Sequence, residues 1–278
     1  MAIDQKKLTG KFILTGTGTA PELLAALDQL PALEKKFRAR PHKVRLAALI
    51  AFIGLSTVGA LGSIGFLIPL SFVVGIGLII YSVVIAGSPI ILNRAEVLRK
   101  DLQMLSEDAG SKGRFDVMLR LRKDEKQISE EPNPRKKGGK QTFLKDEWLT
   151  VTSRMSDGTT LTESYIDLIR KRTKTNPRGK TKSKERRVCM LRAQLRYNPS
   201  TYGNVTDALK RIPKPFRLPD AVQFKGVKAN EKVLVAKADL RGEQAPYKLH
   251  AANQALLLGA YRILNLARRG AIATRSGK

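Results

Sequence analysis

The chain has 278 residues and a formal net charge of +27, from 51 lysines and arginines against 24 acidic residues. Such a charge favours anionic partners: nucleic acid, nucleotides, acidic lipid headgroups or acidic proteins. A single cysteine (Cys189) and two histidines (His42 and His250) exclude an intramolecular disulfide and a zinc site built from Cys and His. A site made of carboxylates stays open, but no residue pattern indicates one, so we expect no metal and no cofactor.

Residues 1–45 form the first segment, with nine basic and four acidic side chains. A short strand is expected over 11–15. Thr19 followed by Pro21 and Glu22 is typical of a helix start, with Thr19 as the N-cap. We expect an amphipathic, basic segment that lies along a membrane surface or packs on the domain that follows.

Residues 46–93 contain no Lys, Arg, Asp, Glu or His over 48 positions. One straight helix of this length would measure roughly 72 Å at about 1.5 Å per residue, more than twice a bilayer core of about 30 Å. Pro69 and nearby glycines break the run, so it predicts a transmembrane helical hairpin with helices at about 46–65 and 69–89. Two alternatives remain: a hairpin buried inside a soluble bundle, as in some pore-forming toxins, and a hairpin that dips into one leaflet.

Basic residues flank this apolar segment on both sides, and such residues concentrate on the cytoplasmic side of membranes. The sequence therefore predicts a multi-pass membrane protein with both termini cytoplasmic, whose flanks contact anionic lipid. Small residues in the hairpin would also permit a homo-oligomer. The predicted juxtamembrane lipid contacts are Lys35, Lys36, Arg38, Arg40, Lys43, Arg45, Arg94, Arg99 and Lys100.

Residues 94–270 are expected to form a basic, soluble α+β domain. Alternating apolar residues predict strands, and Ser156-Asp157-Gly158 is a tight-turn signal. The predicted fold class is a membrane protein: a two-helix transmembrane hairpin plus a cytoplasmic α+β domain. That domain would hold an antiparallel sheet of five or six strands (a small barrel or sandwich) and a C-terminal helix, followed by a flexible tail at 271–278. The expected elements are a helix at 94–109, strands at 115–121, 148–155, 159–169, 188–197, 221–227 and 232–238, a flexible loop at 124–141, and a helix at 246–268.

The segment 170–187 has ten basic residues against one acidic residue and is expected to be a mobile arm between two strands. Flexible cationic side chains suit sequence-independent contacts with phosphate, whereas the lack of aromatic residues gives no indication of base stacking. Anionic lipid or an acidic protein, nucleic acid or a nucleotide, and a plain solvated loop all remain open. The candidate residues are Arg170, Lys171, Arg172, Lys174, Arg178, Lys180, Lys182, Lys184, Arg186 and Arg187.

Catalysis has weak support, because no nucleophile motif is present. The strand region holds five acidic residues that alternation could pair, but we nominate none as catalytic: Asp146, Glu147, Asp157, Glu163 and Asp167. The leading hypothesis is a non-enzymatic, hairpin-anchored scaffold or assembly subunit whose basic domain contacts anionic lipid or an acidic protein. The alternative is a membrane-anchored sensor-effector whose basic, β-rich domain binds a nucleotide or nucleic acid and whose hairpin oligomerises to perturb the membrane.

Overall fold

The computed structural model describes residues 2–3, 8, 12–35, 50, 91–110, 113–132, 139–176, 178–211, 216–242 and 244–276. The chain divides into two compact units, one made of residues 1–27 and 91–278 and the other of residues 28–90. Of the second unit, only residues 28–35 and 50 are described. The architecture below is therefore that of the first unit.

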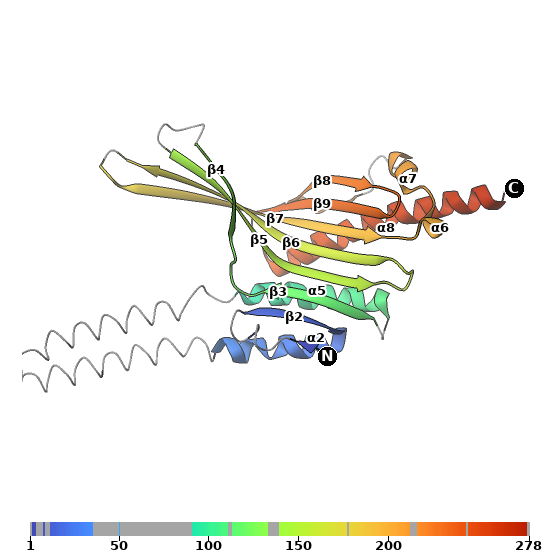
Figure 1. Ribbon diagram of the computed structural model, residues 1–278, viewed down its shortest axis with the longest axis horizontal. Coiled ribbons are helices and arrows are strands. Elements are labelled where there is room, and N and C mark those ends of the chain that lie inside the picture. The colour runs from blue at the N-terminus through green and yellow to red at the C-terminus, as the bar shows by residue number, and fades with distance from the viewer. Residues whose placement is uncertain are drawn as a thin grey trace, which may run out of the picture. The chain divides into compact units, whose positions relative to one another are not determined.

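A single antiparallel sheet of nine strands dominates this unit (Figure 1). Its order is β1-β2-β3-β5-β6-β7-β9-β8, and β4 pairs with β5 beside this path. The strands are β1 (Ala2–Ile3), β2 (Ile13–Thr19), β3 (Arg114–Arg120), β4 (Lys126–Pro132), β5 (Gly139–Arg154), β6 (Thr160–Thr175), β7 (Thr181–Arg196), β8 (Val222–Ala229) and β9 (Val233–Arg241). The observed sheet has nine strands, whereas five or six were expected, and it is one open sheet, not a small barrel or a sandwich.

Two helices, α5 (Leu92–Ala109) and α8 (Pro246–Ser276), cover one face of the sheet and pass behind the strands in Figure 1. Period-two alternation on the strands supplies the core: Cys189, Leu191, Ala193 and Leu195 of β7 are all buried. The described part of this unit also holds three shorter helices: α2 (Ala20–Asp28), α6 (Pro199–Tyr202) and α7 (Val205–Arg211). We call the covered side the helix face and the other side the open face.

The predicted turn at 156–158 is present and joins β5 to β6. Gly158 donates its N–H to the carbonyl of Met155, the Met155 N–H bonds to the Thr159 carbonyl at 2.8 Å, and Gly158 has a φ of 82°. A three-residue loop with glycine in the left-handed region is a common hairpin connection. This turn sets the register of β5 with β6 as far as the bulge between Glu147 and Leu149.

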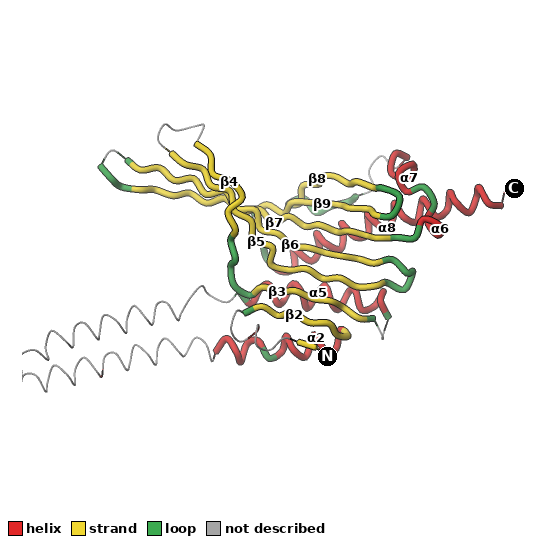
Figure 2. Tube along the Cα trace, in the orientation of Figure 1, coloured by secondary structure: helices red, strands yellow, loops and turns green. Residues whose placement is uncertain are grey.

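Beyond the helix-covered region, four strands continue as a projection, seen on the left of Figures 1 and 2. We call this projection the arm and define it as β4 with residues 139–145 of β5, 170–175 of β6 and 181–187 of β7. Within the arm β7 pairs with β6, because its pairing with β9 begins only at Val188. The expected flexible loop at 124–141 and the expected mobile arm at 170–187 are therefore largely strands in the structure.

Among the helices that the structure describes, none is both long enough and apolar enough to cross a membrane. The two long ones, α5 and α8, carry charges along their length, including Arg94, Lys100, Arg262 and Arg268. This finding contradicts the predicted transmembrane fold class and the predicted multi-pass membrane location. Of the segment on which those predictions rested, residues 46–93, only Ile50 and residues 91–93 fall inside the described part.

The C-terminal prediction also needs a correction. Helix α8 runs to Ser276, whereas the sequence led us to expect a helix ending near Arg268 and a flexible tail. By contrast, the expected helix at 94–109 is observed as α5, and α2 begins directly after Thr19, whose N–H is held by the Glu22 carboxylate at 2.9 Å. That bond is half of a capping box.

Candidate functional site

The arm ends in a tight hairpin between β6 and β7. The Gly179 N–H bonds to the Asn176 carbonyl, the Asn176 N–H bonds to the Lys180 carbonyl, and Gly179 has a φ of 74°. Just inside the turn the hydroxyls of Thr175 and Thr181 lie 3.0 Å apart. The pairing of β6 with β7 then continues without interruption to Thr160 and Arg196.

Pairing without a slip separates the basic side chains of the arm into two faces, because directly paired residues point to the same side of a sheet. Arg172 pairs with Lys184, and Arg170 pairs with Arg186. Asp167 and Ile169 of β6 are buried on the helix face. Because side chains alternate along a strand, the even-numbered residues of β6 and their partners on β7 point to the open face. Six cations consequently share one side of two adjacent strands: Arg170, Arg172, Lys174, Lys182, Lys184 and Arg186.

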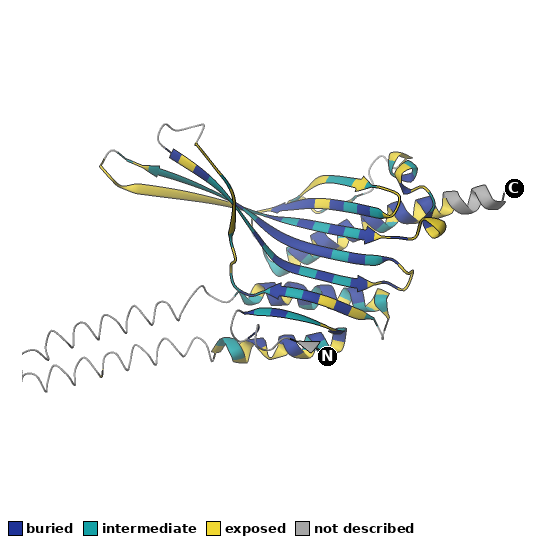
Figure 3. Ribbon diagram, viewed as in Figure 1, coloured by how far each residue is buried: buried dark blue, intermediate teal, exposed yellow. Residues whose placement is uncertain are grey.

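This six-residue group is accessible to solvent. Lys182, Lys184 and Arg186 are exposed, and the three residues on β6 are half-buried. Figure 3 shows the arm segment of β7 largely in the colour of exposed residues. Along each strand neighbouring members lie about 6.6 Å apart, and across the strands about 5 Å apart. The six cations therefore form a compact positively charged surface, whose spacing is fixed by the backbone hydrogen bonds between β6 and β7.

The cations on the other side of the arm are differently placed, because they sit beside carboxylates. Arg187 contacts Asp167 at 3.2 Å and both Glu125 and Glu185 at 3.1 Å. Lys140 contacts Glu130 at 2.8 Å, which raises the pKa of the lysine. The two faces of the arm thus differ in net charge, and the larger positive excess lies on the open face.

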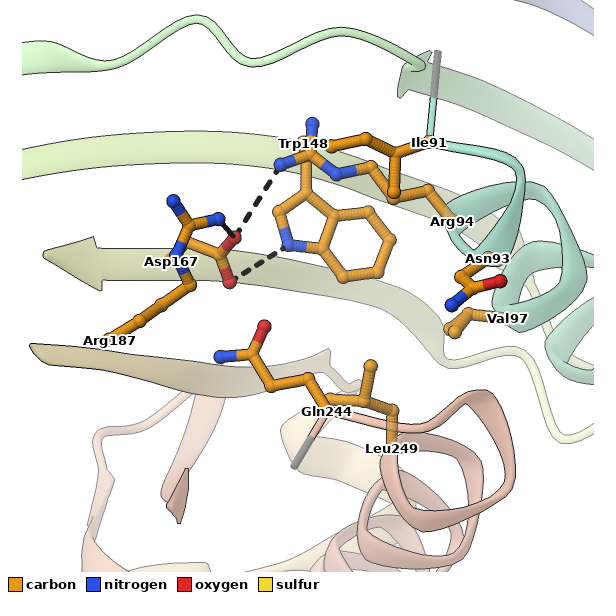
Figure 4. Close-up of a pocket in the computed structure, with 9 residues that line it drawn as sticks. All are labelled: Ile91, Asn93, Arg94, Val97, Trp148, Asp167, Arg187, Gln244 and Leu249. Carbon is orange, nitrogen blue, oxygen red and sulfur yellow. Dashed lines mark hydrogen bonds and ion pairs between the residues drawn. The ribbon is translucent and has the colours of Figure 1, made fainter. Parts of the chain in front are cut away.

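At the root of the arm, Arg187 belongs to a network that Figure 4 shows in close-up. Arg94 of α5 contacts Asp146 at 2.6 Å and Asp167 at 3.5 Å, and Trp148 donates its indole N–H to Asp167 at 3.4 Å. Burial raises the pKa of Asp167, and the charges of Arg187 and Arg94 oppose that rise. Two arginines and two carboxylates therefore balance one another where the sheet meets α5.

A pocket of about 100 Å³ lies beside this network, lined by Ile91, Asn93, Arg94, Val97, Trp148, Asp167, Arg187, Gln244 and Leu249. Ligand sites for molecules of ordinary size occupy roughly 300–1,000 Å³, so the pocket is too small for a nucleotide. Its charged groups already contact each other. We therefore interpret it as the solvated edge of a structural ion network.

A second buried cluster joins the sheet to both long helices. Tyr165 donates to Asp101 at 2.5 Å, and His250 Nδ1 lies 3.0 Å from the other Asp101 oxygen. Glu163 and Asn253, both buried, complete the cluster. Burial raises the pKa of Glu163 well above its usual value, and the nearby Asp101 raises it further. Among the described residues no group of His, Cys, Asp and Glu side chains could hold a metal ion.

Each of the five acidic residues that we considered for catalysis makes contacts that stabilise the fold or lies in a surface ion pair. Asp146, Asp167 and Glu163 are buried in the two clusters. Asp157 holds the β5–β6 turn by accepting from the Thr159 N–H at 2.8 Å, and Tyr202 binds its other oxygen at 2.6 Å. Glu147 lies 3.1 Å from Lys145 at the surface.

The ten basic residues predicted in 170–187 are distributed over the whole end of the arm. Six form the open-face group, Lys171 and Arg187 lie on the helix face, and Arg178 and Lys180 are exposed at the turn.

Of the predicted juxtamembrane residues, Arg94 is buried in the ion network and Arg99 lies 3.7 Å from Glu96. Lys35 and Lys100 are on helical segments at or near the surface. The remaining five (Lys36, Arg38, Arg40, Lys43 and Arg45) lie outside the described residues.

One group of basic residues on the open face was not predicted from the sequence. Arg192 pairs with Lys237, Arg196 with Val233 and Val188 with Arg241, which places Arg192, Arg196, Lys237 and Arg241 on the open face beyond the arm. They lie on strands that were predicted separately. The signal was present as period-two alternation in β7, but only the register of β7 with β9 shows that the residues share a surface.

No protein-family model, curated protein or solved structure matches this chain.

Proposed function

We propose that this protein binds nucleic acid through the phosphate backbone, with the open face of the arm as the contact surface. The observation that supports this most directly is the set of six cations on paired positions of β6 and β7. Lys and Arg contacts to phosphate release condensed counterions and give affinity without sequence preference. The proposal assigns binding to the arm and no catalytic step.

The separation of charge between the two faces favours binding over simple solubility. Charged residues scattered for solubility would be expected on both sides of an exposed ribbon. Here the helix-face cations Arg187 and Lys140 contact carboxylates, while Lys182, Lys184 and Arg186 stand together in solvent. Lysines on an exposed edge also discourage pairing with another chain, but this role does not require that they lie on one face.

The width of the arm limits how it meets a duplex. Four strands at about 4.8 Å spacing span roughly 14 Å before side chains are added, and a major groove is about 12 Å wide. The arm is therefore too wide to enter the groove as a two-stranded ribbon does. Contact through one face with the sugar-phosphate backbone fits this geometry.

The test uses the full chain and a labelled duplex in fluorescence anisotropy at about 0.1 M salt, where phosphate contacts dominate affinity. A triple variant, K182Q/K184Q/R186Q, removes three open-face charges. A matched control, K140Q/K171Q/K210Q, removes the same charge from the helix face of the arm and from α7. We expect the first variant to lose about a hundredfold or more in affinity and the control to change little.

Two competitors distinguish other anionic partners. Poly-glutamate stands for an acidic protein, and vesicles of anionic phospholipid stand for lipid phosphate. If either displaces the duplex at equal charge concentration, the proposal of nucleic acid is wrong. Equal losses in the two triple variants would also overturn it, because only net charge would then matter.

A further inference from the structure

We infer that the bound nucleic acid is double-stranded and that it extends from the arm onto the open face of the sheet beyond it. This inference rests on the proposed function and deepens it. It names the class of nucleic acid, and it adds a second contact zone made of Arg192, Arg196, Lys237 and Arg241, which we call the body zone.

The body zone continues the basic surface of the arm on the same strand. Along β7 the open face carries Lys182, Lys184 and Arg186, then the half-buried Val188 and Met190, then Arg192 and Arg196. Lys237 and Arg241 stand next to these residues on β9, and both are exposed. The one acidic residue of β9 on this face, Asp239, is buried and held by Lys225 at 3.0 Å. The two basic zones therefore lie on one face without an unpaired β9 carboxylate between them.

Polar neutral side chains on the adjacent strands suit the same ligand. Gln194 pairs with Thr162, and Thr162 pairs in turn with Thr152, whose hydroxyl lies 3.2 Å from that of Thr162. Hydroxyl and amide groups of Ser, Thr and Gln commonly contact phosphate and sugar oxygens. Between Arg192 and Arg196 this face consequently offers hydrogen-bond donors as well as charge.

The scarcity of aromatic side chains on this face favours a duplex. Proteins that bind single strands use aromatic platforms, at about 1–3 kcal/mol per stacked base. On the strands that the structure describes, the open face has one aromatic residue, Phe143, and it is half-buried. The aromatic residues Trp148, Tyr165 and Phe115 are buried. Unstacked bases would find almost no ring surface, whereas a duplex needs none.

The strand length gives the expected footprint. From Lys182 to Arg196 along β7 the chain rises at most about 46 Å at roughly 3.3 Å per residue. At about 3.4 Å per base pair this corresponds to roughly 14 base pairs. A duplex of about 7 base pairs would reach one zone, and a duplex of about 16 would engage both zones at once, with the gain that linked contacts give.

The experiment measures affinity for a series of duplexes and matched single strands from about 7 to about 24 residues in length. The full chain is compared with R196Q/K237Q/R241Q, in which exposed residues of the body zone lose their charge. For the unaltered chain we expect affinity to rise steeply up to about 14 base pairs and slowly thereafter. Single strands of equal length should bind at least about tenfold more weakly.

The body-zone variant should bind the shortest duplex within about twofold of the unaltered chain and lose about tenfold or more with long duplexes. A circular-dichroism spectrum checks that the variant keeps its sheet. If length dependence is the same in both proteins, or if single strands bind as tightly as duplexes, this inference is wrong while binding through the arm still stands. If K182Q/K184Q/R186Q lost all binding to duplexes of every length, the body zone would add no contact of its own, and this inference would again be wrong while binding through the arm still stands.

Discussion

Arg186 and Arg187 are consecutive on β7, yet their side chains lie on opposite faces of the arm and have opposite surroundings. Arg187 contacts Asp167 at 3.2 Å and two glutamates at 3.1 Å. Arg186 is exposed and pairs across the ladder with Arg170. One arginine thus fixes the root of the arm to the core, and its neighbour contributes to the surface that we propose binds phosphate.

Substituting Arg94 with Leu should destabilise the protein strongly. Its side chain is 5% exposed and holds Asp146 at 2.6 Å, and removing one partner of a buried pair typically costs about 3–5 kcal/mol. Trp148, the one tryptophan in the chain, packs under the Arg94 guanidinium and reports unfolding by fluorescence in urea. As a control, K210Q breaks an exposed pair with Asp207 and should cost less than about 1 kcal/mol. Equal midpoints for the two variants would contradict the assignment of a buried network.

Stability should depend on the protonation of Glu163. Because its pKa in the folded protein is raised well above 4.5, the folded state holds a proton that the unfolded state releases. The free energy of unfolding should therefore fall as pH rises from about 4.5 through the folded pKa. Glu163→Gln keeps the neutral shape and should flatten this dependence, while Asp101 continues to titrate. Urea unfolding at a series of pH values measures both proteins, and identical slopes would contradict the prediction.

Gly259 of α8 should not tolerate a methyl group. A Cβ there would lie 2.1 Å from the ring of Phe216, which stacks on Phe224 with centroids 4.5 Å apart. Gly259→Ala should therefore cost about 1–3 kcal/mol through overpacking, although alanine favours a helix by about 1 kcal/mol. In the background of Phe216→Ala the same change should become neutral or stabilising. An additive double-mutant cycle would show that the contact is absent.

The strand structure of the basic arm can be tested by cross-linking. Thr175 and Thr181 are direct partners in the ladder, with hydroxyls 3.0 Å apart. T175C/T181C should form a disulfide under mild oxidation, because paired residues bring their Cβ atoms within bridging distance. The out-of-register pair T173C/T181C should form one much more slowly. Comparable rates for the two pairs would indicate a mobile loop, and the buried Cys189 should not interfere.

The sequence predicted the central hairpin because its signals were local. The Ser156-Asp157-Gly158 turn and the alternation on either side of it are observed in β5 and β6. The arm was missed because its basic composition suggested a solvated loop. In fact Lys and Arg alternate with Thr and Ser on both sides of Asn176, and Gly179 follows at the turn. That period of two is typical of a strand whose exposed face is charged.

The ion network could not be predicted in the same way. Arg94 meets Asp146 and Asp167 across 52 and 73 positions of the chain, and no local pattern encodes such contacts. The sequence instead placed Arg94 among residues that flank a membrane. The open face had a similar limit, since Lys237 and Arg241 join Arg192 and Arg196 on one surface only through the register of β7 with β9.

The salt dependence of binding to a duplex of about 8 base pairs tests the central proposal most directly, because each phosphate contact contributes about −0.9 to the slope of log K against log salt. Six open-face contacts predict a slope of about −5 for the full chain, and K182Q/K184Q/R186Q should reduce its magnitude by about 2.7. The control K140Q/K171Q/K210Q should keep the original slope. If both triple variants shift the slope equally, or neither does, the open face of the arm is not the nucleic-acid contact.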